Sequence, residues 1–293
     1  MSEVAFGLAI RPSVRPGTGP VDSARRAEDL GFDFVSASDH PCGTEPTYET
    51  WTMLSWIAAA TTRIRVAPRV LGVPYRNPAM VAKMAETFSR LCDGRLILGL
   101  GGGYSDAEFR AFGLGTFTPR DKVDGLAEAI AITRGLWSEP AFTFGGRLHR
   151  TEDADLEPKP TWPIPIWLGT FGDRALAVTG RLADGWIPSY GDRPLEQYRA
   201  MRERVLTAAR AADRDPGAIT CALHLQVQVD GDADADPSVV AGPPGIVTER
   251  LLAFAGIGFT AFSFAPTGPG AQEQAERLAW EVIPALRDAL TRR

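Results

Sequence analysis

The chain has 293 residues, of which 44% are hydrophobic and 23% charged, and its formal charge is -5. This size is sufficient for one large buried core, and an acidic chain without a basic stripe is not expected to bind nucleic acid. No apolar run reaches the roughly 20 residues that span a bilayer, so no membrane association is expected. The three scattered cysteines (Cys42, Cys92, Cys221) and an N-terminus unlike a signal peptide predict reduced thiols in the cytoplasm.

Short apolar runs alternate with helical patterns along the whole chain. The runs predict strands at 4–10, 32–37, 64–72, 95–101, 164–170, 185–189, 219–229 and 260–266. A first helix should begin at Asp22 or Ser23 and stop at Gly31. Further helices are expected at 48–60, 78–92, 119–137, 172–182, 194–212, 244–256 and 271–290, the last kinked by Pro284.

Eight strand–helix units predict an α/β protein, a single (β/α)8 TIM barrel over residues 1–293. We expect an insertion hairpin and loop at 138–163, where 141-AFTFGGRLHR-150 alternates around two glycines. The acidic, Gly/Pro-rich segment 230–245 is expected to be a mobile loop. A doubly wound open sheet is the alternative, but its G-x-G-x-x-G fingerprint is missing from the first turn, 11-RPSVRPGTGP-20.

Polar residues mark the predicted strand ends, where the active site of such a barrel forms. Asp39 and His40 end the second strand. They are either a strand-end pair that bonds loop backbone or a proton-transfer pair, because imidazole titrates near neutral pH. A metal site is not expected, since too few ligands gather there. Of the other two histidines, His149 belongs to the hairpin and His224 to a strand interior, where a packing role is expected.

Two glycine-rich turns, 99-GLGGGYSD-106 and 169-GTFGDRAL-176, each lead from a strand into a helix. Each is either a tight β–α turn or part of a phosphate cradle, because glycine and a helix N-terminus both favour a bound anion. Ser-His-Asp order, P-loop, HExxH and paired catalytic carboxylates are all missing from the sequence. The chemistry is therefore expected to come from a bound cofactor.

Several stretches resemble the bacterial luciferase-like monooxygenase superfamily, and within it the coenzyme F420 (deazaflavin)-dependent oxidoreductases. They are 27-AEDLGFDFVSASDH-40, 57-IAAATTRIRVAPRVLGVPYRNPAMVAKMAETFSRLCDGRLILGLGGGY-104, 156-LEPKP-160, 163-PIPIWLGTFGDRALAVTGRLADGW-186 and 281-EVIPALR-287. The resemblance implies a flavin-type cofactor, coenzyme F420, and hydride transfer to or from an unidentified small organic substrate. It also implies that His40 is the catalytic residue.

The resemblance further implies which residues contact the cofactor. Asp39 would hydrogen-bond it, and Gly72-Val73 matches a strand-3 bulge that in this family often carries a non-prolyl cis peptide. The backbone of Gly101, Gly102 and Gly103, and that of Gly169, Thr170, Phe171 and Gly172, would meet its side chain and phosphate. The residues expected to line the substrate pocket are Arg11, Cys42, Thr44, Trp51 and Tyr104, with helix packing as the alternative for Trp51.

The sugar-phosphate dehydrogenases of this branch carry a glutamate after the strand-4 glycines. Here that stretch reads Gly102-Gly103-Tyr104 and the first acid is Asp106, which disfavours glucose-6-phosphate as the substrate. Two other functions stay open on the same fold. One is an FMN-dependent monooxygenase served by a separate reductase, and the other is a non-catalytic flavin-binding protein. The strongly apolar stretch 54-LSWIAAA-60 indicates either a homodimer through the second and third helices or burial of that helix against the barrel.

Overall fold

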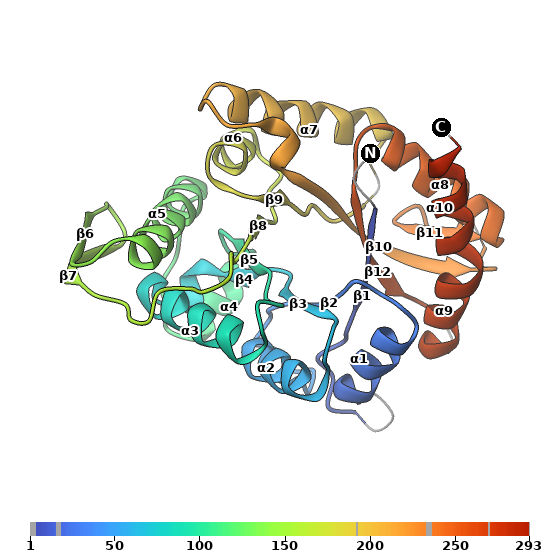
Figure 1. Cartoon of the computed structure of the whole chain (residues 1–293), viewed down its shortest axis with the longest axis horizontal. Helices are drawn as coiled ribbons and strands as arrows, with labels where there is room; N and C mark the ends of the chain where they lie inside the picture. Colours follow the sequence, from blue (N-terminus) through green and yellow to red (C-terminus); the bar gives the residue numbers. More distant parts are fainter. Residues whose placement is uncertain (1–3, 16–18, 192, 233–235, 269, 293) are drawn as a thin grey trace.

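The computed structural model describes residues 4–15, 19–191, 193–232, 236–268 and 270–292. Parallel strands form a central barrel surrounded by helices (Figure 1). They are β1 (Ala5–Ala9), β2 (Phe34–Ala37), β3 (Arg65–Pro68), β4 (Leu71–Gly72), β5 (Leu98–Gly101), β8 (Ile166–Leu168), β9 (Gly185–Trp186), β10 (Thr220–Val229) and β12 (Ala261–Pro266). They pair in the order β3-β2-β1-β12-β10-β9-β8-β5-β4. The predicted single α/β barrel is confirmed.

The third strand position is interrupted, because β3 and β4 are two parts of one strand separated by Arg69 and Val70. A bridge between Val66 and Leu96 joins β3 to the residues before β5, and β4 pairs with β5, so the ring closes. The peptide bond between Arg69 and Val70 is cis. The bulge expected at Gly72-Val73 therefore lies three residues earlier, and Val73 instead begins the 3-10 turn η1 (Val73–Tyr75).

The outer helices are α1 (Pro20–Asp29), α2 (Thr50–Ala60), α3 (Pro78–Leu91), α5 (Pro119–Ser138), α6 (Asp173–Leu182), α7 (Leu195–Arg210), α8 (Pro244–Gly256), α9 (Ala271–Arg277) and α10 (Ile283–Thr291). Local signals set their starts: the Glu49 carboxylate caps α2 and the Asn77 side chain caps α3. A π-helical turn, η3 (Leu278–Val282), separates α9 from α10 just before Pro284. The expected interruption of the last helix thus takes the form of a π turn, because proline lacks the N–H that would continue the α-helical bonding.

Two features lie outside the barrel rhythm. Strands β6 (Phe142–Gly145) and β7 (Arg150–Ala154) pair antiparallel and project beyond α5, at the left of Figure 1. Strand β11 (Val239–Gly242) pairs with the end of β10, so the part of 230–245 from 239 to 242 is not a loop. Its buried Val239 and Val240 favour a strand, and the Gly/Pro-rich composition around them hid this signal. Residues 233–235 of that segment lie outside the described residues.

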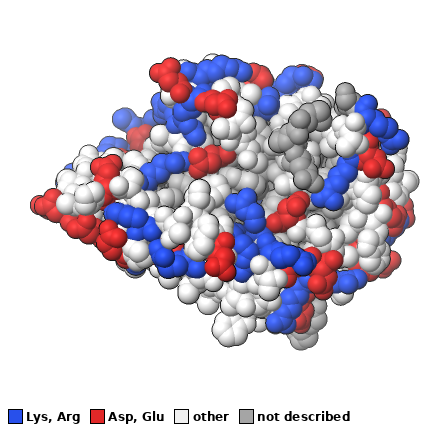
Figure 2. All heavy atoms as spheres, viewed as in Figure 1, with Lys and Arg blue, Asp and Glu red and all other residues white. Residues whose placement is uncertain are grey.

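Shorter elements connect these parts. They are α4 (Asp106–Ala111), which follows β5, and the 3-10 turn η2 (Pro216–Ala218), which precedes β10. No helix among the described residues is long and apolar enough to cross a membrane. Acidic and basic side chains are interspersed over the face shown in Figure 2. Surface salt bridges of the chain include Arg134 with Asp184 and Arg174 with Asp124.

The barrel interior changes from apolar to polar along the strands. Phe34 and Trp167 pack edge to face inside it, with ring centroids 5.7 Å apart, in a cluster with small residues such as Ala222. Because side chains two residues apart point to the same face of a strand, Ser36 and His224 follow them inside the barrel, nearer the mouth. The interior below the mouth is therefore built to bring polar groups together.

Candidate active site

His40 lies at the end of β2 with an exposed ring, and a carboxylate holds it in place. Its Nδ1 lies 3.0 Å from Oε1 of Glu108, in the first turn of α4. The Tyr75 hydroxyl donates to Oε2 of the same carboxylate over 2.6 Å. The exposed ring of Tyr104 lies edge-on to His40, with centroids 6.3 Å apart. A histidine, a carboxylate and a phenol from three separate segments thus meet at the barrel mouth.

The electrostatics of this group favour a charged carboxylate. Burial on its own would raise the pKa of Glu108, but the hydrogen bonds from Tyr75 and His40 lower it on balance. Burial and the neighbouring Glu108 raise the pKa of Tyr75, so its hydroxyl keeps its proton and donates. An ionised carboxylate accepts from Nδ1–H of His40, and this assigns Nε2 as the ring nitrogen that faces other partners.

Asp39, the neighbour of His40, has a different role. Its side chain is fully buried and forms a two-pronged ion pair with Arg76, with N–O distances of 2.7 and 3.0 Å. The backbone N–H of Gly72 also donates to it over 3.0 Å, and Arg76 bonds Glu49 as well. Asp39 was expected to hydrogen-bond the cofactor, but both of its oxygens already have protein partners. Successive residues of an extended chain point in opposite directions, which separates the two side chains.

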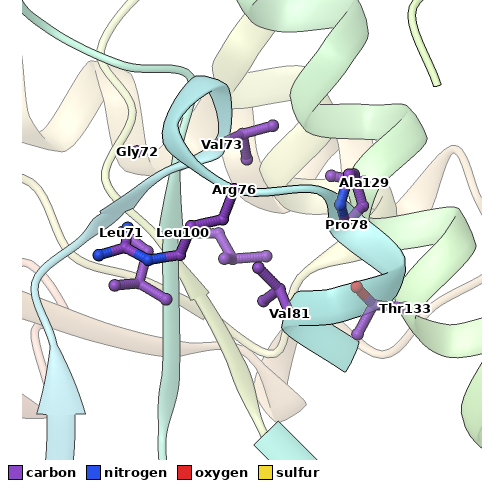
Figure 3. Close-up of a pocket in the computed structure, with 9 residues that line it drawn as sticks. All are labelled: Leu71, Gly72, Val73, Arg76, Pro78, Val81, Leu100, Ala129 and Thr133. Carbon is purple, nitrogen blue, oxygen red and sulfur yellow. The ribbon is translucent and has the colours of Figure 1, made fainter. Parts of the chain in front are cut away.

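The space beneath Arg76 is too small for a ligand (Figure 3). The cavity has a volume of about 10 Å³, which corresponds to roughly one water molecule. Thr133 Oγ1 lines it and has no hydrogen-bond partner in the described structure. The other lining residues are mostly apolar: Leu71, Gly72, Val73, Arg76, Pro78, Val81, Leu100 and Ala129. Gly72 and Val73 therefore line a structural cavity.

Two of the predicted cofactor glycines pack closely against Val70 of the interrupted strand. A Cβ on Gly101 would lie 2.5 Å from Cγ2 of Val70, and one on Gly169 would lie 3.1 Å from the same atom. Gly103 has φ of +90°, which favours glycine. Close packing and a positive φ therefore favour glycine at these positions even without a bound ligand. Anion binding, the reason inferred from the sequence, explains only part of the pattern.

Gly172 differs, because a Cβ there would meet no atom within 4 Å. It is the N-cap of α6 and supplies no side-chain hydrogen bond, so the first backbone N–H groups of that helix can donate to a ligand. A groove of about 470 Å³ lies here. Arg120, Lys122 and Arg174 line it, and each is paired with a carboxylate of Asp124 or Asp106. The remaining lining residues are Gly102, Pro119, Val123, Leu126, Gly169, Thr170, Phe171, Gly172, Asp173 and Ala175. An open helix N-terminus with basic neighbours fits a phosphate group.

Within that groove the predicted residues divide by where their side chains point. The hydroxyl of Thr170 is buried and bonds Thr179 Oγ1 over 2.7 Å, so only its backbone remains for a ligand. Phe171 is 40% exposed, with the Arg193 guanidinium 5.1 Å from its ring centre. A Cβ on Gly102 would lie 2.8 Å from the backbone oxygen of Lys122, so this glycine allows α5 to approach β5.

The five expected substrate residues are not all at the mouth. Arg11 is exposed at the end of β1 and donates to the Pro266 carbonyl over 3.3 Å. Cys42, a free thiol, and Thr44 lie in the loop after β2. Trp51 as a substrate residue is wrong: it is 9% exposed on α2, outside the barrel, with its ring edge-on to Phe88 of α3 at 5.2 Å.

Sequence reasoning missed Glu108, Tyr75 and Arg69. A signal for Glu108 was present, because 105-SDAE-108 has the spacing of a helix start and puts the glutamate in the first turn after β5. The first acid after the glycines, Asp106, instead pairs with Lys122 over 2.8 Å. The contacts of Tyr75 and Arg69 join distant segments, and no local pattern announces them.

Comparison with known proteins agrees with this architecture. The luciferase-like monooxygenase family model matches residues 6–239. An F420-dependent glucose-6-phosphate dehydrogenase from Intrasporangium calvum is 30% identical over 91% of this chain and 94% of its own length. An F420-dependent hydroxymycolic acid dehydrogenase from Mycobacterium tuberculosis is 32% identical over 73% of this chain and 60% of its own length.

Solved structures share the fold at lower identity. An F420-dependent secondary alcohol dehydrogenase, solved with an F420-acetone adduct, superposes with a TM-score of 0.87. It is 20% identical, and the match covers 98% of this chain and 100% of the other. On the family match and the full-length relative together, the chain belongs to the luciferase-like monooxygenase family, in its branch of F420-dependent oxidoreductases.

Proposed function

We propose that this protein transfers a hydride between coenzyme F420 and a small organic substrate, with His40 moving the matching proton. The observation that carries the proposal is the orientation of His40 by an ionised Glu108 at the barrel mouth. The names of the relatives support the cofactor, since they include F420-dependent dehydrogenases acting on a sugar phosphate and on a hydroxymycolic acid. The substrate of this chain is left at the level of an alcohol or carbonyl compound.

The groove at the start of α6 would hold the cofactor's phosphate. The N–H groups after Gly172 would donate to it, and Lys122 and Arg174 would lower the electrostatic penalty of its charge. When bound, the deazaflavin supplies the ring carbon that gives or accepts the hydride.

His40 would exchange the proton through Nε2. Its Nδ1–H stays hydrogen-bonded to the Glu108 carboxylate, which fixes the ring orientation. Tyr75 completes the arrangement by holding the other carboxylate oxygen. His40 would thus contact the substrate, and Glu108 would position the His40 ring without contacting the substrate.

The first experiment is a titration of the purified protein with oxidised F420 and, separately, with FMN, followed by fluorescence and thermal stability. We expect binding of F420, and binding of FMN alone would move the function to a two-component monooxygenase. Binding of neither would refute the phosphate site at Gly172. Oxygen uptake with reduced FMN gives an independent check on the monooxygenase alternative.

The second experiment tests the proton-transfer group. His40→Gln should lower turnover by about 100-fold or more while F420 affinity stays unchanged, since general acid–base groups contribute roughly 10²–10⁴. Glu108→Gln should lower turnover by about tenfold, because the ring loses the charge-assisted hydrogen bond that orients it. Glu152→Gln, in the exposed strand β7, is the matched control. Full turnover in His40→Gln would refute the role.

A further inference from the structure

Arg69 lies inside the barrel, where the third strand is interrupted. Its charge acts on His224 of β10, a residue of the barrel interior, which places the two side chains near each other. The residue is half-buried, and its Nε is shielded from solvent without a hydrogen-bond partner. Among the residues that the structure describes, no carboxylate pairs with this guanidinium. Arg69 directly follows the carboxyl end of β3, the end at which the strands of such a barrel meet its mouth.

Two other partly buried guanidinium groups, those of Arg76 and Arg95, are fully engaged by the protein. Arg76 pairs with Asp39 and Glu49, and Arg95 donates to backbone and hydroxyl oxygens between Ala58 and Cys92. Burying a charge without a partner is unfavourable, and folded chains normally avoid it. Among the arginine side chains that the structure describes, only that of Arg69 has a buried nitrogen without a hydrogen-bond partner.

The surroundings of Arg69 are polar but uncharged. His224 interacts electrostatically with it and is 8% exposed, and its Nδ1 lies 3.2 Å from the Ser263 hydroxyl. Ser263 in turn lies 2.9 Å from the Ser36 hydroxyl, and both serines are fully buried. Ser36 is paired with Ala67 across β2 and β3, and Arg69 lies two residues further along the chain, so of these groups Arg69 lies nearest the barrel mouth.

The net charge of this cluster is positive near neutral pH. Burial lowers the pKa of Arg69 to about 10, which leaves it protonated. Burial and the charge of Arg69 together lower the pKa of His224 well below its ordinary value, so the imidazole is neutral. One unpaired positive charge therefore faces the interior beside a neutral ring that can exchange hydrogen bonds.

We propose that Arg69 and His224 form an anion-binding subsite that takes a carboxylate or a comparable planar oxyanion of a bound ligand. The fork of N–H donors on a guanidinium matches two oxygens in one plane, and a shielded site strengthens such a bond. The oxyanion has two possible sources. One is a carboxylate on the substrate, and the other is an anionic ring oxygen of the cofactor. Only the second source rests on the proposed function.

The test uses acetate as the probe and the ring protons of the histidines as the readout. The chain has only three histidines, so their NMR signals can be assigned with single variants. Acetate bound beside Arg69 should offset its positive charge and raise the pKa of His224. Arg69→Met should weaken acetate binding by at least about tenfold, the factor that one charge-assisted hydrogen bond contributes.

Arg65→Met is the matched control, because Arg65 is also half-buried and lies at the opposite end of β3. It should bind acetate as the unchanged protein does. The proposal is overturned if acetate leaves His224 unaffected, or if Arg69→Met binds it equally well. A large fall of Tm in Arg69→Met with unchanged acetate binding would likewise overturn it and assign Arg69 a structural role.

Adding F420 distinguishes the two sources. If F420 displaces acetate, the occupant is an oxygen of the cofactor ring, and Arg69→Met should then also weaken F420 binding and shift its absorption spectrum. If both bind together, the subsite takes a carboxylate of the substrate. The acetate experiment uses the protein without cofactor, so it tests the Arg69 subsite independently of the proposed function. Failure to bind acetate would not contradict F420 binding, and failure to bind F420 would not contradict acetate binding.

Discussion

The contact between Asp39 and Arg76 gives the sharpest stability prediction. The carboxylate is completely buried and the guanidinium is 15% exposed, with N–O distances of 2.7 and 3.0 Å. Asp39→Asn keeps the shape but removes the charge and one acceptor. It leaves Arg76 with Glu49 as its remaining carboxylate and disturbs the hydrogen bond from Gly72 N–H. We expect the loop between β4 and α3 to lose its main attachment to β2.

The magnitude follows from the burial. Breaking a buried ion pair from one side destabilises a protein by about 3–5 kcal/mol, and the remaining Glu49 contact places this case near 3 kcal/mol. The entropy of unfolding is about 2.1 cal/mol/K per residue, which for 293 residues is roughly 0.6 kcal/mol/K. Dividing the two gives a fall in Tm of about 5 °C.

Thermal unfolding followed by circular dichroism and calorimetry measures this shift. Asp22→Asn is the control, because its pair with Arg25 is 3.6 Å long and strongly exposed. It should change Tm by less than about 1 °C, as exposed pairs contribute little. If Asp39→Asn keeps the original Tm and instead loses affinity for F420, the reasoning is refuted and Asp39 is a cofactor ligand after all.

Three further outcomes are expected. Gly172→Val should weaken F420 binding by about tenfold without loss of Tm, because its Cβ meets only open space, while Gly145→Val, equally unobstructed in the hairpin, should change neither. The pKa of His224 is lowered in the folded state, so the unfolded chain binds a proton first as pH falls. The contribution of His224 to the free energy of unfolding is therefore fully present above about pH 6.5. Below that pH the free energy of unfolding should decrease by up to ~1.4 kcal/mol per pH unit. His224→Asn should remove that slope in urea titrations, and an unchanged slope would contradict the assignment. Trp56 on α2 and Leu91 on α3 are 72% and 82% exposed. If these helices form a homodimer, Leu91→Glu should sediment as a monomer. A variant that still sediments as a dimer would place the interface elsewhere.

The fold could be predicted because its signals are local. Each barrel strand is a short apolar run, and each helix has its own start and stop residues, such as Asn77 before α3 and Gly31 after α1. A repeated strand–helix rhythm allows few topologies, so the barrel followed. The errors lie where composition and conformation disagree, as in β11, whose two valines form a strand within a Gly/Pro-rich segment.

The site could be predicted only where the barrel topology determines it. His40 and Gly172 follow strand ends, and all strand ends of a parallel barrel meet at one mouth. The partner of His40 is 68 positions away, and Tyr75 reaches the same carboxylate from a third segment. Such meetings depend on the path of the loops, which propensity and periodicity do not specify. The ion pair of Asp39 was missed for the same reason, since its partner Arg76 belongs to another loop.

The segment 69–76 organises most of this mouth, although only its Gly72-Val73 step was singled out from the sequence. Arg76 and the Gly72 N–H hold Asp39, and Tyr75 holds the carboxylate that orients His40. Those hydrogen bonds fix the path of the chain between β3 and α3. The Arg69 guanidinium takes no part in them, and its Nε stays unbonded in a shielded position. Because its neighbours already determine the shape of the segment, Arg69 is the residue whose charge is left to meet a ligand.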